Sequence, residues 1–194
     1  MKLQIHYPHR PYLISQKWGN PNPAYASQFN DTNFKLHNGI DSNIGKKNSL
    51  GDIVTEYPVW CPVEGFRVSS VRYEPNGGGN ELWLKSLNKL EINGRECYAS
   101  IGLCHAKKIF VKAGDTPKLG ELLMIADSTG FSTGLHTHMG LYRLDDSGRK
   151  MDVNEATGSS DPAPFFTGAF AVDKSTAQTL AISIGRYFRY IMGF

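Results

Sequence analysis

Short β-rich segments separated by glycine-containing turns fill the middle of this chain, and they limit its fold more than any other feature. Glycine accounts for 20 of the 194 residues, about one in ten against a typical share of about 7%. The pattern predicts an all-β sandwich or barrel. The expected strands cover residues 59–63, 66–72, 81–85, 95–103, 121–126 and 135–142.

Turn residues predict how these strands are joined. Glu64 and Gly65 separate two strand-like segments, and we expect a hairpin there. Residues 76–80 and the pair Asn93-Gly94 each precede a further strand. Residues 19–33 are rich in Asn and Pro and are expected to form a loop.

The chain is expected to divide into a β domain over residues 1–170 and a helical tail over residues 171–194. Ser175 or Thr176 is a suitable N-cap for the tail. Apolar residues then recur at the spacing of one helix face, which predicts an amphipathic C-terminal helix packed on the domain. They are Ala177, Leu180, Ala181, Ile184, Phe188 and Ile191.

Composition excludes several classes of protein. The chain is 40% hydrophobic and 20% charged, with a net charge of +3, which is typical of a folded domain and gives no reason to expect a nucleic-acid partner. It has neither a membrane-spanning apolar run nor a signal-peptide pattern. We therefore expect synthesis in the cytoplasm without a classical signal. Cys61, Cys97 and Cys104 form no C-x-x-C pair and are expected to be reduced and buried.

The histidines are the residues that carry chemistry, and there are only six. His136 and His138 are two apart, so they share one face of an extended strand. His37 and Asp41 also share a face in an extended segment. A catalytic zinc site uses three protein ligands and a water, so His37, Asp41 and one of the paired histidines would suffice. The paired histidine that is not a ligand and His105 would then remain for proton transfer. The alternative to a metal site is that these are ordinary structural histidines.

Residues 15–164 resemble the lysostaphin-type zinc endopeptidases, which cut peptide cross-bridges in bacterial peptidoglycan. Six pieces match in the family's order. Near the start, SQKWGNP at 15–21 is similar to the family's opening S-Q-x-F-G, and HNGID at 37–41 is similar to H-x-G-x-D. In the middle, VWCPVEGFRV at 59–68 is similar to P-V-x-A-x-x-x-G-x-V, and GGN at 78–80 is similar to the G-G-x-G-N turn. Towards the end, His105 with IFVKAGD at 109–115 is similar to Y-x-H-L and V-K-x-G-D-x-V, and GFSTGLHTH at 130–138 is similar to T-G-x-S-T-G-x-H-L-H.

The resemblance implies a fold, a metal and a reaction. The fold would be antiparallel sheets of short strands that form a sandwich-like groove. His37, Asp41 and His138 would bind zinc, and His105 and His136 would be the catalytic histidines. The substrate would be a peptidoglycan peptide, hydrolysed by a zinc metalloendopeptidase.

Two features leave alternatives open. Leu135, Thr137 and Met139 depart from the family pattern, and residues 46–57 are an insertion that is expected to reshape the groove. A non-catalytic wall-binding or assembly module on the same fold is the alternative function. The missing signal suits a phage tail or lysis component, or a secretion-device partner, that acts on the cell wall as a virion part or released protein.

Overall fold

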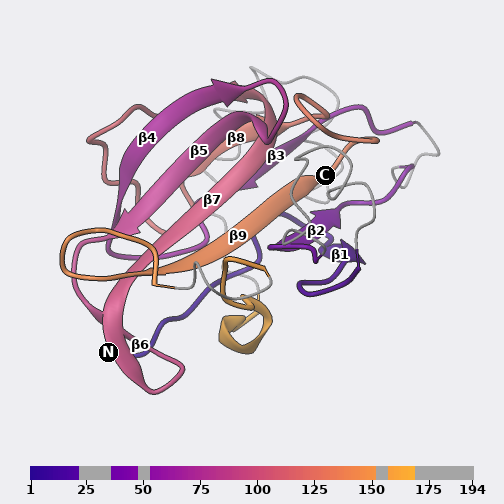
Figure 1. Ribbon diagram of the computed structural model, residues 1–194. Helices are drawn as coiled ribbons and strands as arrows, with labels where there is room; N and C mark the ends of the chain where they lie inside the picture. Colours follow the sequence, from indigo (N-terminus) through magenta and orange to yellow (C-terminus); the bar gives the residue numbers. More distant parts are fainter. Residues whose placement is uncertain (22–35, 48–52, 152–156, 169–194) are drawn as a thin grey trace.

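The computed structural model describes residues 1–21, 36–47, 53–151 and 157–168 (Figure 1). The predicted loop over residues 19–33 falls mostly outside this part of the chain. The predicted C-terminal helix and the tail of residues 171–194 lie outside it entirely.

The described residues form a β protein, as the sequence predicts, and neighbouring strands pair antiparallel throughout. A short 3-10 helix, η1 (Ala163–Phe165), follows the last strand. The strands are β1 (Leu13–Gln16), β2 (Ile40–Asn43), β3 (Tyr57–Trp60), β4 (Phe66–Glu74), β5 (Gly79–Ser86), β6 (Leu90–Ile92), β7 (Arg95–Ile109), β8 (Leu122–Ala126) and β9 (Thr137–Leu144).

Strand β7 is the centre of the sheet. The strand order is β1-β2-β9-β7-β5-β4, while β6 pairs with β7 and β8 pairs with both β3 and β7. The first residues of β7 pair with β6, its middle part from Ser100 to Leu103 lies between β5 and β9, and its last residues, from Ala106, pair with β8. Figure 1 shows this long strand crossing the molecule beside β5 and β9. One strand therefore belongs to both parts of the sheet.

The two faces of the central strands differ in character. Leu84, Ile101 and Leu141 lie side by side across β5, β7 and β9, and all three are fully buried in the core. On the opposite face, the neighbouring row consists of Trp83, Gly102 and Gly140. Successive side chains of a strand point to opposite faces. The row of buried apolar residues therefore faces the core, and the row with the two glycines forms the open face of the sheet.

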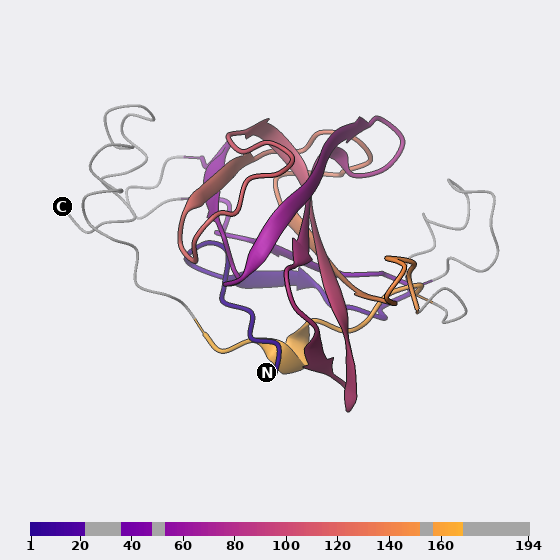
Figure 2. The ribbon, with the colours of Figure 1, turned by 90° about the vertical axis from the view of Figure 1, so that its left-hand side faces the viewer.

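The N-terminal segment contributes to the core and lies against η1. Ile5 is fully buried, and its backbone N–H donates to the carbonyl of Phe165 at 2.8 Å. Figure 2 accordingly shows η1 beside the start of the chain. The two ends of the described β domain therefore support each other.

The predicted hairpin between residues 59–63 and 66–72 is wrong. β3 pairs with β8, and β4 pairs with β5. Beyond β3, the N–H of Cys61 donates to the carbonyl of Glu121 at 2.7 Å, and Pro62 has no N–H to offer a partner strand. The turn at Gly65 exists, with φ of +75°, but it joins different parts of the sheet.

Other sequence predictions hold in the described residues. Cys61, Cys97 and Cys104 are free and buried. The strand after the Asn93-Gly94 turn is present, although it is longer than expected. Among the described residues there is no helix of the length and apolarity needed to cross a membrane.

Candidate metal centre

Three potential metal ligands converge beside β9. His37 Nε2 lies 3.1 Å from Asp41 Oδ1 and 3.1 Å from His138 Nδ1, and His138 Nδ1 lies 2.9 Å from Asp41 Oδ1. Both histidines are buried, and Asp41 is partly buried. This ligand group (His37, Asp41 and His138) could hold a metal ion.

Strand pairing brings the ligand group together. Asp41 on β2 stands directly opposite His138 on β9, so their side chains lie on the same face. His37 precedes β2 by a short turn through Gly39. A Cβ on Gly39 would come within 2.6 Å of the His138 ring and 2.5 Å of the Met139 carbonyl. Only glycine allows the two segments to approach this closely.

The orientation of His37 fits a metal ligand. Its Nδ1 lies 3.0 Å from the carbonyl oxygen of Lys17, which can only accept, so Nδ1 carries the proton of the neutral ring. The lone pair of Nε2 then faces Asp41 and His138. Metal-bound histidines are typically held by such a hydrogen bond from the other ring nitrogen.

The distances also fit a small divalent cation. With zinc bonds of about 2.0–2.1 Å, tetrahedral ligand atoms stand about 3.3–3.4 Å apart, close to the separations of 2.9–3.1 Å in the ligand group. Burial would raise the pKa of Asp41, but hydrogen bonds and charge from His138 and His37 outweigh it and hold that pKa far below its usual value. The carboxylate is therefore ionised and available as a ligand.

His105 and His136 stand beside the ligand group. Their ring centroids are 4.5 Å apart, and His136 Nε2 lies 3.6 Å from Asp41 Oδ1. His105 Nδ1 donates to the Thr129 carbonyl at 2.8 Å, and His136 Nδ1 donates to the Gly134 carbonyl at 2.8 Å. In each neutral ring, Nε2 is then the atom that can accept a proton.

His105 occupies an irregular point of β7. Between the pairs Asn80–Ala106 and Leu82–Leu103, one residue of β5 faces two of β7, which is a β-bulge. His105 has a positive φ of 67°. Its N–H donates to the Gly78 carbonyl at 2.7 Å. Burial, and then the neighbouring His136, lower the pKa of His105 from 6.5 to about 4.

A buried carboxylate supports this bulge. Glu81 accepts from the Gly78 N–H at 3.1 Å, from Arg72 Nε at 2.7 Å and from Trp83 Nε1 at 2.7 Å. Glu81 thereby links the turn that holds His105 to two side chains farther along the sheet. This role of Glu81 could not be predicted from the sequence, because its three partners come from different segments.

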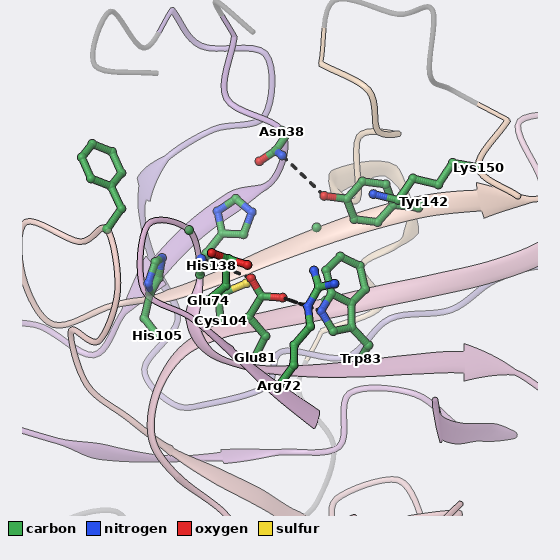
Figure 3. Close-up of a pocket in the computed structure, with 15 residues that line it drawn as sticks. Asn38, Arg72, Glu74, Glu81, Trp83, Cys104, His105, His138, Tyr142 and Lys150 are labelled. Carbon is green, nitrogen blue, oxygen red and sulfur yellow. Dashed lines mark hydrogen bonds and ion pairs between the residues drawn. The ribbon is translucent and has the colours of Figure 1, made fainter. Parts of the chain in front are cut away.

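A cavity of ≈380 Å³ opens next to the ligand group on the open face of the sheet. His105 and His138 lie at one end of it, and Arg72, Trp83, Tyr142 and Lys150 gather at the other (Figure 3). Gly102 and Gly140 contribute to its lining. The cavity therefore leads away from the ligand group along β9.

A second cavity, of ≈630 Å³, also borders the ligand group, since Asp41 and His136 are among its lining residues. The base of the insertion contributes to it: Lys46, Lys47, Ile53 and Val54 are among its lining residues, and the Val54 N–H donates to the Lys46 carbonyl at 3.0 Å. The described ends of the insertion thus border the site, as expected.

The structure brings together all five residues singled out from the sequence: His37, Asp41, His105, His136 and His138. Of the two paired histidines, His138 joins the ligand group and His136 lies against His105. His136 sits just before β9, in an isolated bridge with Asp127. The sequence missed the supporting contacts of Lys17 and Thr129, which are made by backbone carbonyls and leave no sequence signal.

Comparison with known proteins finds a sequence relative that is described as a metalloprotease. A protein of Haemophilus influenzae described as an uncharacterized metalloprotease is 32% identical over 116 residues. The match covers 60% of this chain, which spans about a fifth (20%) of that relative. The chain matches no model of a known protein family.

The fold is found in several solved structures. The catalytic domain of the antimicrobial peptidase lysostaphin from Staphylococcus simulans is similar with a TM-score of 0.52 and 21% identity, covering 79% of this chain and 91% of that one. A zinc-containing peptidase from Vibrio cholerae has a TM-score of 0.54 and 21% identity, covering 83% and 40%. The resemblance to lysostaphin-type peptidases is thus confirmed in the fold, which also contains a possible metal site.

The same fold also occurs in a protein assembly. A structure of the SpoIIQ–SpoIIIAH pore-forming complex contains a chain similar to this one with a TM-score of 0.53 and 15% identity, covering 86% of this chain and 92% of that one. The fold alone therefore does not separate a peptidase from an assembly component.

Proposed function

We propose that this chain is a zinc-dependent endopeptidase that hydrolyses peptide cross-links or stem peptides of bacterial peptidoglycan. The convergence of His37, Asp41 and His138 beside a second pair of histidines carries the proposal. His37 and His138 offer imidazole nitrogen and Asp41 offers carboxylate oxygen, which are ligands that zinc accepts. Three protein ligands leave a fourth position for water or substrate, as in catalytic zinc sites.

When bound to these ligands, zinc would lower the pKa of its water towards 7 and polarise the carbonyl of the scissile peptide bond. His105 and His136 supply the proton transfers. Because their Nδ1 protons are held by backbone carbonyls, each Nε2 begins as an acceptor for a proton of the attacking water. The protonated ring can then donate to the leaving amine.

Burial suits His105 to this role. With its pKa lowered to about 4, the ring is neutral at pH 7, so its Nε2 lone pair is available there. The hydrogen bonds to Thr129 and Gly78 fix the ring and its backbone, so the acceptor atom is already oriented before substrate arrives.

The substrate assignment is supported by the lysostaphin-like fold and by the two cavities that border the ligand group. An extended peptide could cross the site from one cavity to the other. The proposal places the activity at the bacterial cell wall, where this substrate is found. Association with a phage tail or secretion device stays a prediction.

A non-catalytic assembly module is the second candidate, favoured by the similarity to the SpoIIQ–SpoIIIAH complex. A scaffold has no need for three ligands facing one another or for two further oriented histidines. The intact set in this chain supports the enzyme.

Metal content and cleavage test the proposal together. The purified chain, stripped with chelator and reloaded, should hold close to one zinc per chain and release new amino termini from purified peptidoglycan. Asp41→Ala should lose both properties, because it removes a ligand. Asp115→Ala is the matched control, since that carboxylate caps only the Lys112 N–H of an exposed turn.

Several chemotypes of peptidoglycan should be digested, because the position of the new amino termini identifies the bond. A folded wild-type chain that refuses zinc would refute the metal site. A chain that binds zinc and cleaves no chemotype would favour the assembly module.

A further inference from the structure

Two aromatic rings lie over the sheet at the far end of the first cavity. A Cβ on Gly102 would come within 3.0 Å of the Trp83 ring, and a Cβ on Gly140 within 2.9 Å of the Tyr142 ring. These rings occupy the space that larger side chains on β7 and β9 would take. Their centroids are 5.4 Å apart, so they form one aromatic surface that lines the cavity.

Two cations lie on this aromatic surface. Lys150 Nζ stands 3.8 Å from the centroid of Tyr142 and 5.4 Å from that of Trp83. Arg72 Cζ stands 5.2 Å from the centroid of Trp83. Both positions fall within the range of cation–π contact. The rings therefore hold two positive charges at the same end of the cavity (Figure 3).

Neither cation is fully neutralised by the described residues. Lys150 has no carboxylate partner among them. Arg72 uses Nε for Glu81, which leaves its terminal nitrogens available. Glu81 already accepts hydrogen bonds from Gly78, Arg72 and Trp83, and Glu74 is the other acidic residue that lines the cavity.

The two charges also affect each other. Burial, and then the neighbouring Arg72, lower the pKa of Lys150, and the negative charge of Glu81 offsets this only in part, which is the effect expected of an ammonium group held near a like charge in a partly closed place. An anion placed between the two groups would relieve this repulsion and accept hydrogen bonds from both. This end of the cavity is thus complementary to negative charge.

This surface is continuous with the candidate metal centre. Asn38, next to the ligand His37, donates from Nδ2 to the Tyr142 hydroxyl at 3.5 Å. Tyr142 is four residues beyond His138 on β9, on the same face, which corresponds to about 13 Å. A peptide extended along the cavity would cover that length with about four residues.

We propose that Arg72 and Lys150 form an acidic-group subsite that binds a carboxylate of the peptide substrate, up to about four residues from the cleaved bond. This inference rests on the proposed function for its reaction, and it names the substrate class: a stem peptide with a free carboxylate. A peptide whose carboxylates are all amidated lacks the group that both cations would bind.

Binding to the metal-free protein tests the subsite separately from catalysis. Two stem peptides are compared by calorimetry, identical except that the side-chain or α-carboxylates of one are amidated. We expect the free-carboxylate peptide to bind at least tenfold more tightly, since hydrogen bonds to charged groups are the strong ones. Raising the salt concentration should reduce this preference.

The variant Lys150→Met should lose most of the preference and bind both peptides alike, while Lys150→Arg should retain it. Lys85→Met is the matched control, because Lys85 makes a similar contact of 5.2 Å over Tyr98 outside this cavity. Circular dichroism verifies that each variant is folded.

Equal binding of the two peptides by wild-type protein, or no binding of either, would overturn the subsite. A preference that survives in Lys150→Met and also in Arg72→Gln would do the same. If the wild-type protein cleaves both peptides at equal rates, the peptidase stands and the subsite is wrong. If it prefers the free carboxylate and cleaves neither, the subsite stands and the proposed function is wrong.

Discussion

The buried ring of His9 makes the stability of the protein depend on pH. His9 is 1% exposed. Its Nδ1 donates to the Pro11 carbonyl at 2.9 Å, and its Nε2 accepts from the Ser42 hydroxyl at 2.9 Å. The neutral ring satisfies both contacts. Burial lowers the pKa of His9 from 6.5 to about 4, so the folded state resists protonation.

The sign and size of the effect follow by linkage. Between pH 6.5 and 4 the unfolded chain binds a proton at His9 that the folded chain does not, so stability falls as the pH falls. With pKa values of 6.5 and about 4, the loss is about 2 kcal/mol at pH 5 and approaches about 3 kcal/mol at lower pH. Above pH 6.5 this contribution to stability is complete.

Urea unfolding of metal-free protein at pH 7.5 and pH 5 measures this loss, with His9→Phe as the comparison. Phenylalanine keeps a ring between Tyr12 and Tyr57 but leaves Ser42 without its acceptor, a cost that does not change over this pH range. His105 adds pH dependence of the same sign in both proteins. The stability difference between them should shrink by about 2 kcal/mol on going to pH 5. A difference that stays constant would refute the buried neutral ring.

Two further predictions concern the candidate metal centre. His105→Ala and His136→Ala should each keep zinc and thermal stability while losing about 10²–10⁴ in cleavage rate; loss of zinc in either variant, measured by elemental analysis, would contradict the division of roles. Gly39→Ala should weaken zinc binding by at least tenfold, because its Cβ would meet the His138 ring at 2.6 Å. Gly134→Ala is the control, since its Cβ would have no atom within 4 Å, and equal zinc affinity of the two variants would show that close approach at Gly39 is unimportant.

The sequence predicted the strands well wherever alternation and turn residues acted together. The strand of Glu81–Lys85 and the one after Asn93-Gly94 are both present, since each alternates and follows a turn. Pairing was harder to predict. The segment at residues 59–63 contains apolar residues that suit any partner, and its partner β8 lies about 60 residues away along the chain. No local signal distinguishes that partner from the adjacent β4.

In the candidate site too, one part could be predicted from the sequence and another part could not. Side chains with known chemistry could be found in the sequence, because histidine is scarce in this chain and His37, Asp41 and His138 stand in recognisable spacings. The contacts that orient these side chains could not be found in the sequence. The bulge at His105 is held by Gly78, which Glu81 supports, and although the turn at residues 78–80 resembles a family motif, nothing in the sequence indicates that it contacts His105. The cations over Trp83 and Tyr142 likewise meet only when β4, β5 and β9 are assembled.

The ligand group joins parts of the chain that are far apart, and this has a consequence for folding kinetics. His37 and His138 are separated by 101 positions, and β9, which carries His138, pairs with β2 and β7. Contacts of such long range form late and slowly, because loop closure must precede them. During synthesis, every strand up to β8 leaves the ribosome before His138 does. The complete ligand group can therefore form only after the last strand has docked, so the nascent domain spends most of its synthesis without it.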